Sequence, residues 1–203
     1  MAAPDQIVDL RDGSRAVLRP IRLADKQALA EGFAHMSDES RYKRFLTPMN
    51  ELREKDLKYL TEVDHHDHEA IVASSLDGQP LGVARYVRSP SGSAEAAVAV
   101  VDDWQGRGLG TALLQRLAER ACEEGIDHFT AIMLASNHEM LTLLKELGAT
   151  EVTDAGGGVL EVEVELPAAA EDPSAPLRRA LRSAAAGHVG TRAGQMVRSL
   201  HRG

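Results

Sequence analysis

The pattern of apolar and polar positions changes period repeatedly along the chain, which predicts strands alternating with helices. Strand-type patterns occupy residues 15–22, 69–76, 81–88, 94–101, 128–134, 149–153 and 159–166. Apolar residues at helical spacing occupy residues 24–35, 38–45, 51–62, 106–124 and 137–147. This succession predicts an α/β (α+β) fold, a mixed six- to seven-stranded sheet with helices on both faces.

Turn and cap residues support these boundaries. Asp77-Gly78-Gln79-Pro80 separates two strands and is a hairpin signal. Asn50 is placed to cap the helix over 51–62. Gly125 and Gly148 each follow a predicted helix, as C′ glycines do.

The composition changes after Pro167 to Ala, Pro, Ser and Arg. We therefore divide the chain into one domain over 1–166, a linker over 167–176 and a basic Ala/Arg-rich tail over 177–203. The tail is predicted either as short helices, because it has leucines at i,i+4 spacing, or as a disordered solvated segment.

The formal net charge of −8 is unevenly distributed. Residues 167–203 hold six arginines against Glu171 and Asp172, which leaves 17 basic and 29 acidic side chains in residues 1–166. An acidic body argues against nucleic-acid binding and suits cationic acceptors such as amines or lysine-rich surfaces.

Composition also indicates the compartment. Hydrophobic residues make up 43% of the chain, which is usual for a soluble globular protein, and aromatics at 3% predict an aliphatic core. Cys122 is the only cysteine, which excludes a disulfide framework and fits a reducing compartment. No apolar stretch approaches a membrane span and the N-terminus lacks a signal-peptide pattern, so we expect a cytoplasmic protein without membrane partners.

The strand at 94–101 leads through a short acidic turn into Gln105-Gly106-Arg107-Gly108-Leu109-Gly110, and Thr111 follows in the next helix. Glycines let the main chain approach a ligand closely, and the first N–H groups of a helix attract anions. Strand, loop and helix in this order predict a phosphate cradle, to which Arg107 adds charge-assisted hydrogen bonds. The missing Gly-Lys-Ser/Thr and the Gly-x-Gly-x-Gly spacing disfavour a P-loop NTPase and a dinucleotide-binding fold.

This loop resembles the pyrophosphate loop of the GNAT acetyltransferase superfamily, whose members bind acetyl-CoA there. The order of predicted elements is similar to the GNAT fold over roughly residues 14–166. The resemblance implies acetyl-CoA as the cofactor and direct attack of an amine on the acetyl thioester.

Glu95 is the candidate general base for that attack. Presenting a lysine amine of pKa ~10.4 in its neutral form at pH 7 costs ~4.6 kcal/mol, so a residue that takes the proton assists the reaction. Glu95 precedes the apolar stretch 96–101, and its alanine neighbours leave room for a substrate and predict the partial desolvation that raises a carboxylate pKa. The alternative is a glutamate on the wet face of an edge strand.

Other segments narrow the resemblance to one group of enzymes within the superfamily. Four segments are similar to stretches of bacterial Pat-type protein lysine acetyltransferases. They are Glu39-Ser-Arg-Tyr-Lys-Arg-Phe45, the His-His-Asp-His segment within 59–72, the strand beginning Ala94-Glu95, and Leu134–Gly148. Together they cover most of residues 37–148. This resemblance implies acetylation of an exposed lysine on a protein, with acyl-CoA synthetases as the best-known targets.

The family resemblance also assigns the binding residues, because in GNAT proteins the pantetheine arm pairs with the backbone of the catalytic strand. It implies main-chain contacts from Val98, Ala99 and Val100, with one N–H polarising the acetyl carbonyl. Asn137 would hydrogen-bond the pantetheine and Met140 would pack nearby. Asn137 is equally suited to cap the helix that follows it.

Leu144 departs from the family pattern, in which many members carry a tyrosine seven residues after this asparagine as acid to the leaving thiolate. Without this tyrosine, the thiolate leaves unprotonated or another group serves as the acid.

The polar segment 64–68 has no second ligand pair at metal spacing, so we expect a turn and no metal. Trp104 is expected to pack beneath the loop.

Three functional hypotheses remain open from the sequence. The first is a Pat-like protein lysine acetyltransferase, and the second is acetylation of a small amine or amino acid. The third is a non-catalytic acyl-CoA-binding sensor in which Glu95 faces water. We expect a monomer or weak homodimer with no nucleic-acid partner.

Overall fold

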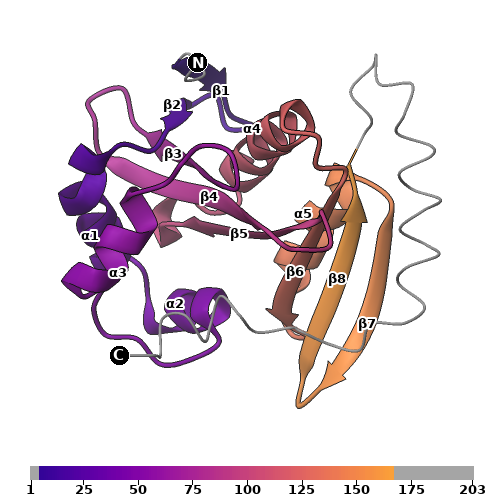
Figure 1. Cartoon of the computed structure of the whole chain (residues 1–203). Coiled ribbons are helices and arrows are strands. Elements are labelled where there is room, and N and C mark those ends of the chain that lie inside the picture. The colour runs from indigo at the N-terminus through magenta and orange to yellow at the C-terminus, as the bar shows by residue number, and fades with distance from the viewer. Residues whose placement is uncertain (1–4, 167–203) are drawn as a thin grey trace.

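The structure is a computed structural model of the chain, and it describes residues 5–166. Its centre is a sheet of eight strands in the order β1-β2-β3-β4-β5-β6-β8-β7. The strands are β1 (Gln6–Asp9), β2 (Arg15–Pro20), β3 (His68–Ser74), β4 (Pro80–Arg88), β5 (Ala94–Val100), β6 (His128–Leu134), β7 (Thr150–Gly156) and β8 (Val159–Glu165). Figure 1 shows β6, β8 and β7 set at a steep angle to β3, β4 and β5.

Helices cover both faces of this sheet (Figure 1). The α-helices are α1 (Lys26–Ala34), α2 (Asp38–Phe45), α3 (Glu54–Thr61), α4 (Leu109–Glu123) and α5 (His138–Leu147), and short 3-10 turns cover Leu23–Asp25 and Asp102–Trp104. Helices α4 and α5 pack on one face, and α1, α2 and α3 lie on the other.

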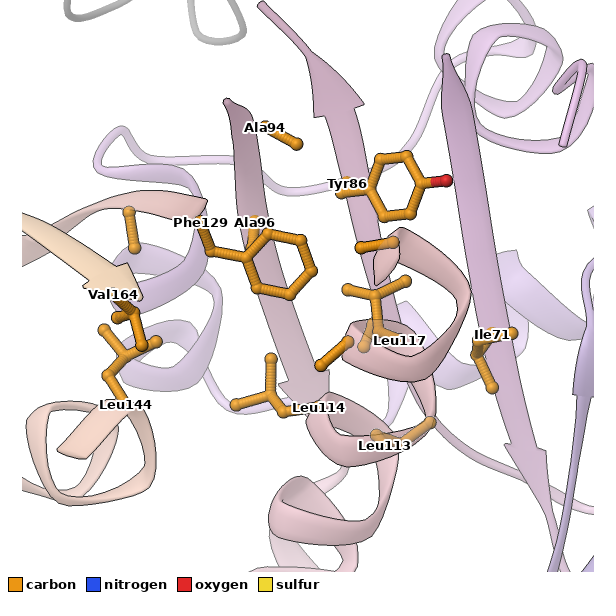
Figure 2. Close-up of a cluster of buried hydrophobic side chains, with 14 of the residues drawn as sticks. Ile71, Tyr86, Ala94, Ala96, Leu113, Leu114, Leu117, Phe129, Leu144 and Val164 are labelled. Atoms are coloured by element: carbon orange, nitrogen blue, oxygen red, sulfur yellow. The ribbon is translucent and has the colours of Figure 1, made fainter. Parts of the chain in front are cut away.

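The hydrophobic core lies between α4 and the sheet. Figure 2 shows Leu113, Leu114 and Leu117 of α4 in one cluster with the rings of Tyr86 and Phe129, with Leu117 near the rings. The two ring centroids are 6.0 Å apart. Most other core residues are aliphatic, as the composition predicts.

One pair of strands differs from the others. All neighbouring strands are antiparallel except β5 and β6, which are parallel and pair only at Ala94↔Phe129 and Glu95↔Thr130. From Ala96 onwards β5 has no partner on the β6 side, although it stays paired with β4 as far as Val100. The sheet therefore opens immediately after Glu95.

The predicted fold class is confirmed, with corrections in detail. The sheet has eight strands rather than six or seven, because the short strand β1 pairs with β2 at the edge. Four residues with little apolar alternation gave no strand signal.

The predicted helix over 51–62 begins later than expected. Asn50 does not cap it: α3 starts at Glu54 with Arg53 at the N-cap, where the Arg53 N–H donates to Asp56 Oδ2 at 3.0 Å. A carboxylate at the third helical position satisfies that backbone donor without a capping side chain.

Gly125 has φ +74°, as a C′ glycine should, and the amide N–H of Gly125 donates to the carbonyl of Cys122. Gly148 differs from this prediction, because its φ of 178° is extended backbone open to any residue. A Cβ at Gly148 would lie 1.9 Å from the carbonyl oxygen of Glu165 on β8. Gly148 is therefore required by close packing and not by a left-handed turn.

The predicted linker over 167–176 and tail over 177–203 lie outside the described residues. Within residues 5–166, no helix has both the length and the apolar character needed to span a membrane.

Candidate active site

A cavity of about 380 Å³ lies where the sheet opens. Residues of β5 from Glu95 to Val100 form one wall, the glycine loop closes one end, and α2 and α5 line the sides. The sequence segments that the motifs singled out, far apart in the chain, therefore meet around one space.

The glycine loop has the predicted strand, turn and helix around it. Gly106 and Gly108 have φ values of +72° and +90°, and Gly108 is the N-cap of α4. Gly106, Gly108, Gly110 and Thr111 all line the cavity. Both glycines have left-handed backbone conformations, which residues with side chains rarely adopt, and these conformations bring the backbone to the cavity wall.

Two loop residues point elsewhere. The Arg107 guanidinium donates to Asp12 Oδ2 at 3.1 Å and to the Asp103 carbonyl at 2.7 Å, and it lies 4.8 Å from the Trp104 ring. Leu109 is 1% exposed and belongs to the core. Neither residue lines the cavity, so Arg107 braces the loop in this structure, and its contact with a phosphate stays a prediction.

Gln105 joins the loop to its neighbours. Its side-chain amide donates to the Val100 carbonyl at 3.0 Å and to Ser40 Oγ at 3.1 Å. Ser40 in turn donates to Asp102 Oδ1 at 2.6 Å, and Asp102 also accepts from the Ser37 N–H. The start of α2 is thus fixed to the turn that precedes the loop.

Glu95 faces the cavity from the side of the sheet covered by α1, α2 and α3. It is half-buried, and burial raises the pKa of its carboxyl group, with Arg44 opposing and Glu161 reinforcing the effect. A carboxylate in this environment is a stronger base than one in water. Glu95 therefore lines the cavity and is not fully exposed.

Val98, Ala99 and Val100 also line the cavity, on the part of β5 that β6 leaves. Backbone groups of an unpaired strand edge accept an added extended chain through ladder hydrogen bonds. An extended arm that contains amides fits this edge.

Asn137, at the start of α5, is placed both to cap the helix and to contact a ligand in the cavity. Its side-chain Oδ1 accepts the Met140 N–H at 3.2 Å, which is an N-cap contact, and both residues line the cavity. Leu144, by contrast, is fully buried among core residues beside Val164 (Figure 2). Position 144 therefore does not face the cavity.

Several cavity residues were not singled out from the sequence. They are Arg44 and Lys43 on α2, Tyr59 on α3, and Arg11 beside the loop. Arg44 and Tyr59 fall within segments that carried the family resemblance, but no local pattern shows that they turn towards β5. Arg11 had no signal, because it lies near the N-terminus, far from the loop in the sequence.

Arg11 provides a cation at the loop. It is exposed, its N–H donates to the Arg107 carbonyl at 3.0 Å, and its only ion pair within residues 5–166 is a 3.4 Å contact with Glu146. We expect Arg11→Gln to weaken acetyl-CoA binding about three- to tenfold at low salt, and less at high salt, because an exposed charge is screened.

Calorimetric titration at two ionic strengths measures this effect. Arg15→Gln on β2 is the matched control, because Arg15 is exposed and does not line the cavity. Equal affinities of the wild type and Arg11→Gln for acetyl-CoA at both ionic strengths would exclude a contact between Arg11 and acetyl-CoA.

The His-rich segment forms separate contacts. His65 bonds Glu69 at 2.8 Å, His66 bonds Glu124, and His68 Nε2 lies 3.0 Å from Arg85 Nη1. Across residues 5–166, no three His, Cys, Asp or Glu side chains gather as metal ligands. The segment forms a turn held by Asp64 Oδ1, which accepts three backbone N–H groups.

His68 is expected to make the stability of the fold depend on pH. Burial, with Arg85 adding to it, lowers the pKa of His68 to about 4, against about 6.5 in the unfolded chain. Between these values only the unfolded state takes up the proton. The free energy of unfolding should therefore fall by up to about 3 kcal/mol as the pH drops from 6.5 to 4.

Urea unfolding of the wild type and His68→Gln over pH 4–7.5 tests this. The variant should lose this part of the pH dependence, whereas His35→Gln, at an exposed histidine, should keep it. Parallel curves for the wild type and His68→Gln would show that another group is responsible.

Comparison with known proteins identifies the family. The model of the acetyltransferase (GNAT) family matches residues 31–149, which is more than half of the chain. The chain therefore belongs to the GNAT acetyltransferase family, and its mixed sheet is the GNAT fold.

Two Pat proteins are similar over most of the domain. Acetyltransferase Pat of Mycolicibacterium smegmatis is 34% identical over 163 residues, covering 79% of this chain and 48% of Pat. This chain thus spans about half the length of that relative. The crystal structure of the GNAT domain of S. lividans PAT, 33% identical, has a TM-score of 0.74 and covers 80% of this chain and 97% of that domain.

A more distant neighbour shares the fold alone. It is yncA of Salmonella typhimurium, a putative acetyltransferase solved with its cofactor acetyl-CoA. It is 23% identical with a TM-score of 0.61, covering 78% of this chain and 98% of yncA.

Proposed function

We propose that this acetyltransferase transfers an acetyl group from acetyl-CoA to a primary amine, with Glu95 as the general base and a lysine side chain of a protein as the acceptor. The observation that carries the proposal is the opening of the sheet directly after Glu95. It places one half-buried carboxylate beside an unpaired strand edge in the same cavity.

The donor end of the cavity suits a coenzyme with a diphosphate and a long amide-containing arm. Backbone N–H groups of Gly106, Gly108 and Gly110 at the start of α4 would hold the diphosphate. The strand edge at 98–100 would pair with the arm, while the Asn137 amide and Met140 would contact it from α5. The bound coenzyme supplies an activated thioester.

Glu95 would act at the other end of that strand segment. An alkylammonium acceptor must lose a proton before its nitrogen can attack, and Glu95 would accept that proton directly or through one water molecule. Backbone N–H groups of 98–100 would polarise the acetyl carbonyl, as oxyanion-hole donors do. Burial supports the role of Glu95 because it raises the pKa of the carboxyl group.

The acceptor is proposed from the Pat relatives. Likeness to Pat over most of the domain supports a protein lysine, such as one on an acyl-CoA synthetase. A free amino acid is the second candidate, favoured by the half-buried Arg44, which lines the cavity together with Glu95. The cytoplasmic location and the monomeric or weakly dimeric state stay predictions.

Transfer from labelled acetyl-CoA to acceptors tests the proposal. The full chain is incubated with acyl-CoA synthetase, unrelated lysine-rich proteins and single amino acids, and label on each acceptor is measured. Label on a lysine of a protein supports the primary proposal, and label only on amino acids supports the second candidate. Binding of acetyl-CoA without transfer to any acceptor would favour a sensor.

A further inference from the structure

Arg85 is a buried cation on the cavity side of the sheet. It is 1% exposed, and its register partner Ala97 places it on the face that Glu95 occupies. Its Nη1 contacts His68 and its Nη2 donates to the Leu60 carbonyl at 3.1 Å. Within the described domain no carboxylate forms an ion pair with it.

Arg44 is a second cation close to the first. It is half-buried on α2, its guanidinium lies 4.8 Å from the Phe45 ring, and no carboxylate of residues 5–166 lies within ion-pair distance. Burial lowers the pKa of Arg44 to about 10, and burial together with Arg44 lowers the pKa of Arg85 to about 9. Both guanidinium groups therefore remain charged at pH 7.

The two arginines meet at a smaller cavity. This cavity, of about 90 Å³, is lined by both guanidinium-bearing residues, and Arg44 also lines the main cavity with Glu95. Its other shared walls are mostly apolar: Met36, Phe45, Leu60 and Ala99. The carboxylate of Asp25 also lines it, but Asp25 already receives both Arg19 nitrogens at 2.7 and 2.8 Å.

Charges do not balance at the junction between the two cavities, where Arg44 lines both. Arg44 shares the main cavity with Glu95, which must be free to accept a proton if it is the base, and Arg85 has no carboxylate partner within residues 5–166. Removing a guanidinium from water is costly unless a carboxylate compensates for it. A ligand carboxylate at the junction would meet two forked donors in an apolar surrounding, where such pairs are strongest.

We propose that Arg44 and Arg85 form a subsite for a carboxylate carried by the acceptor, so that its amine is presented to Glu95. The inference rests on the proposed function and specifies its acceptor. The carboxylate is either the α-carboxylate of a free amino acid or an acidic side chain next to the target lysine of a protein.

Paired acceptors that differ only in this group test the subsite. One arm compares amino acids with their carboxamides, and the other compares lysine peptides flanked by Asp or Glu with peptides flanked by Asn or Gln. We expect the wild type to favour the carboxylate member of one arm at least about tenfold in kcat/KM. The arm that shows the preference identifies the source.

The variants are Arg44→Gln, Arg44→Lys and the control Arg22→Gln, whose exposed side chain pairs with Asp5 outside both cavities. Arg44→Gln should abolish the preference by raising KM for the carboxylate member of a pair at least about tenfold more than for the carboxamide member, whatever change it causes in both through Glu95. Arg44→Lys should retain part of it, and Arg22→Gln all of it. Equal losses on both members of a pair would show a purely structural role and overturn the proposal.

Calorimetric titration of the same acceptors in the presence of CoA makes the test independent of turnover. Carboxylate binding by the wild type that is lost in Arg44→Gln supports the subsite even if no acceptor is acetylated, a result that would count against the proposed function alone. The subsite proposal is overturned if the wild type fails to discriminate carboxylates from carboxamides in both binding and turnover. Arg85→Gln is added only if its thermal unfolding shows a folded protein.

Discussion

Glu95→Gln is expected to lower kcat by about 10²- to 10⁴-fold at pH 7, because glutamine keeps the shape of the side chain but cannot accept a proton. Acetyl-CoA affinity should change less than twofold, since the coenzyme is expected to bind along 98–100 and the glycine loop. Steady-state kinetics and calorimetry measure the two quantities separately.

The pH profile gives the same test a second readout. Burial holds the pKa of Glu95 above its usual value, so the base form is lost as the pH falls through that raised value. For an acceptor amine that titrates well above pH 7, the reactive complex holds ionised Glu95 and the ammonium form of the acceptor, so log kcat/KM of the wild type should rise with slope one below the pKa of Glu95 and level off above it. Glu95→Gln should show slope one throughout.

Glu163→Gln is the matched control. Glu163 is an exposed carboxylate on β8 outside the cavity, so its variant should keep both the rate and the change of slope. A Glu95→Gln enzyme that retains wild-type kcat and the wild-type profile would remove Glu95 from the chemistry. Loss of acetyl-CoA binding in that variant would instead assign it a structural role.

Gly148→Ala is expected to destabilise the fold by at least about 2–3 kcal/mol, the cost of forcing extra volume into a packed site. A Cβ there would lie 1.9 Å from the Glu165 carbonyl oxygen, which belongs to backbone and cannot rotate away. The strand β8 or the end of α5 must shift. Because α5 carries Asn137 and Met140, acetyl-CoA binding should weaken as well.

Gly32→Ala on α1 is the opposite case. A Cβ at Gly32 meets only Pro80 at 3.5 Å, an ordinary contact, and alanine is favoured over glycine inside a helix by roughly 0.5–1 kcal/mol. Urea unfolding should therefore show one glycine replacement that destabilises and one that stabilises. A Gly148→Ala protein as stable as the wild type would show that the close approach is relaxed in solution.

Much of the site was predicted from local patterns, because its parts are local. The predicted helix over 38–45 and strand over 128–134 match α2 and β6, whose apolar spacing and flanking caps are contained in the segments themselves. The loop at 105–110 likewise combines a strand end, glycines and a helix start within a few residues. Residue-level roles assigned by resemblance, such as that of Glu95, stay predictions.

Side-chain direction and distant neighbours could not be predicted in this way. Arg107 was expected to face phosphate, but Asp12, 95 positions earlier, holds its side chain away from the cavity. Gly148 looked like a helix stop, and only the path of β8 shows that it leaves no room for a Cβ.

By itself the sequence determined the succession of elements, the glycine-rich helix entry and the acetyltransferase family, since each depends on periodicity or on a motif contained in one stretch. Only the tertiary structure decided that β5 leaves β6 after Glu95, and that Arg44 and Arg85 line one small cavity. These features depend on strand register and on packing between segments far apart in the chain, and neither quantity is encoded in a local pattern.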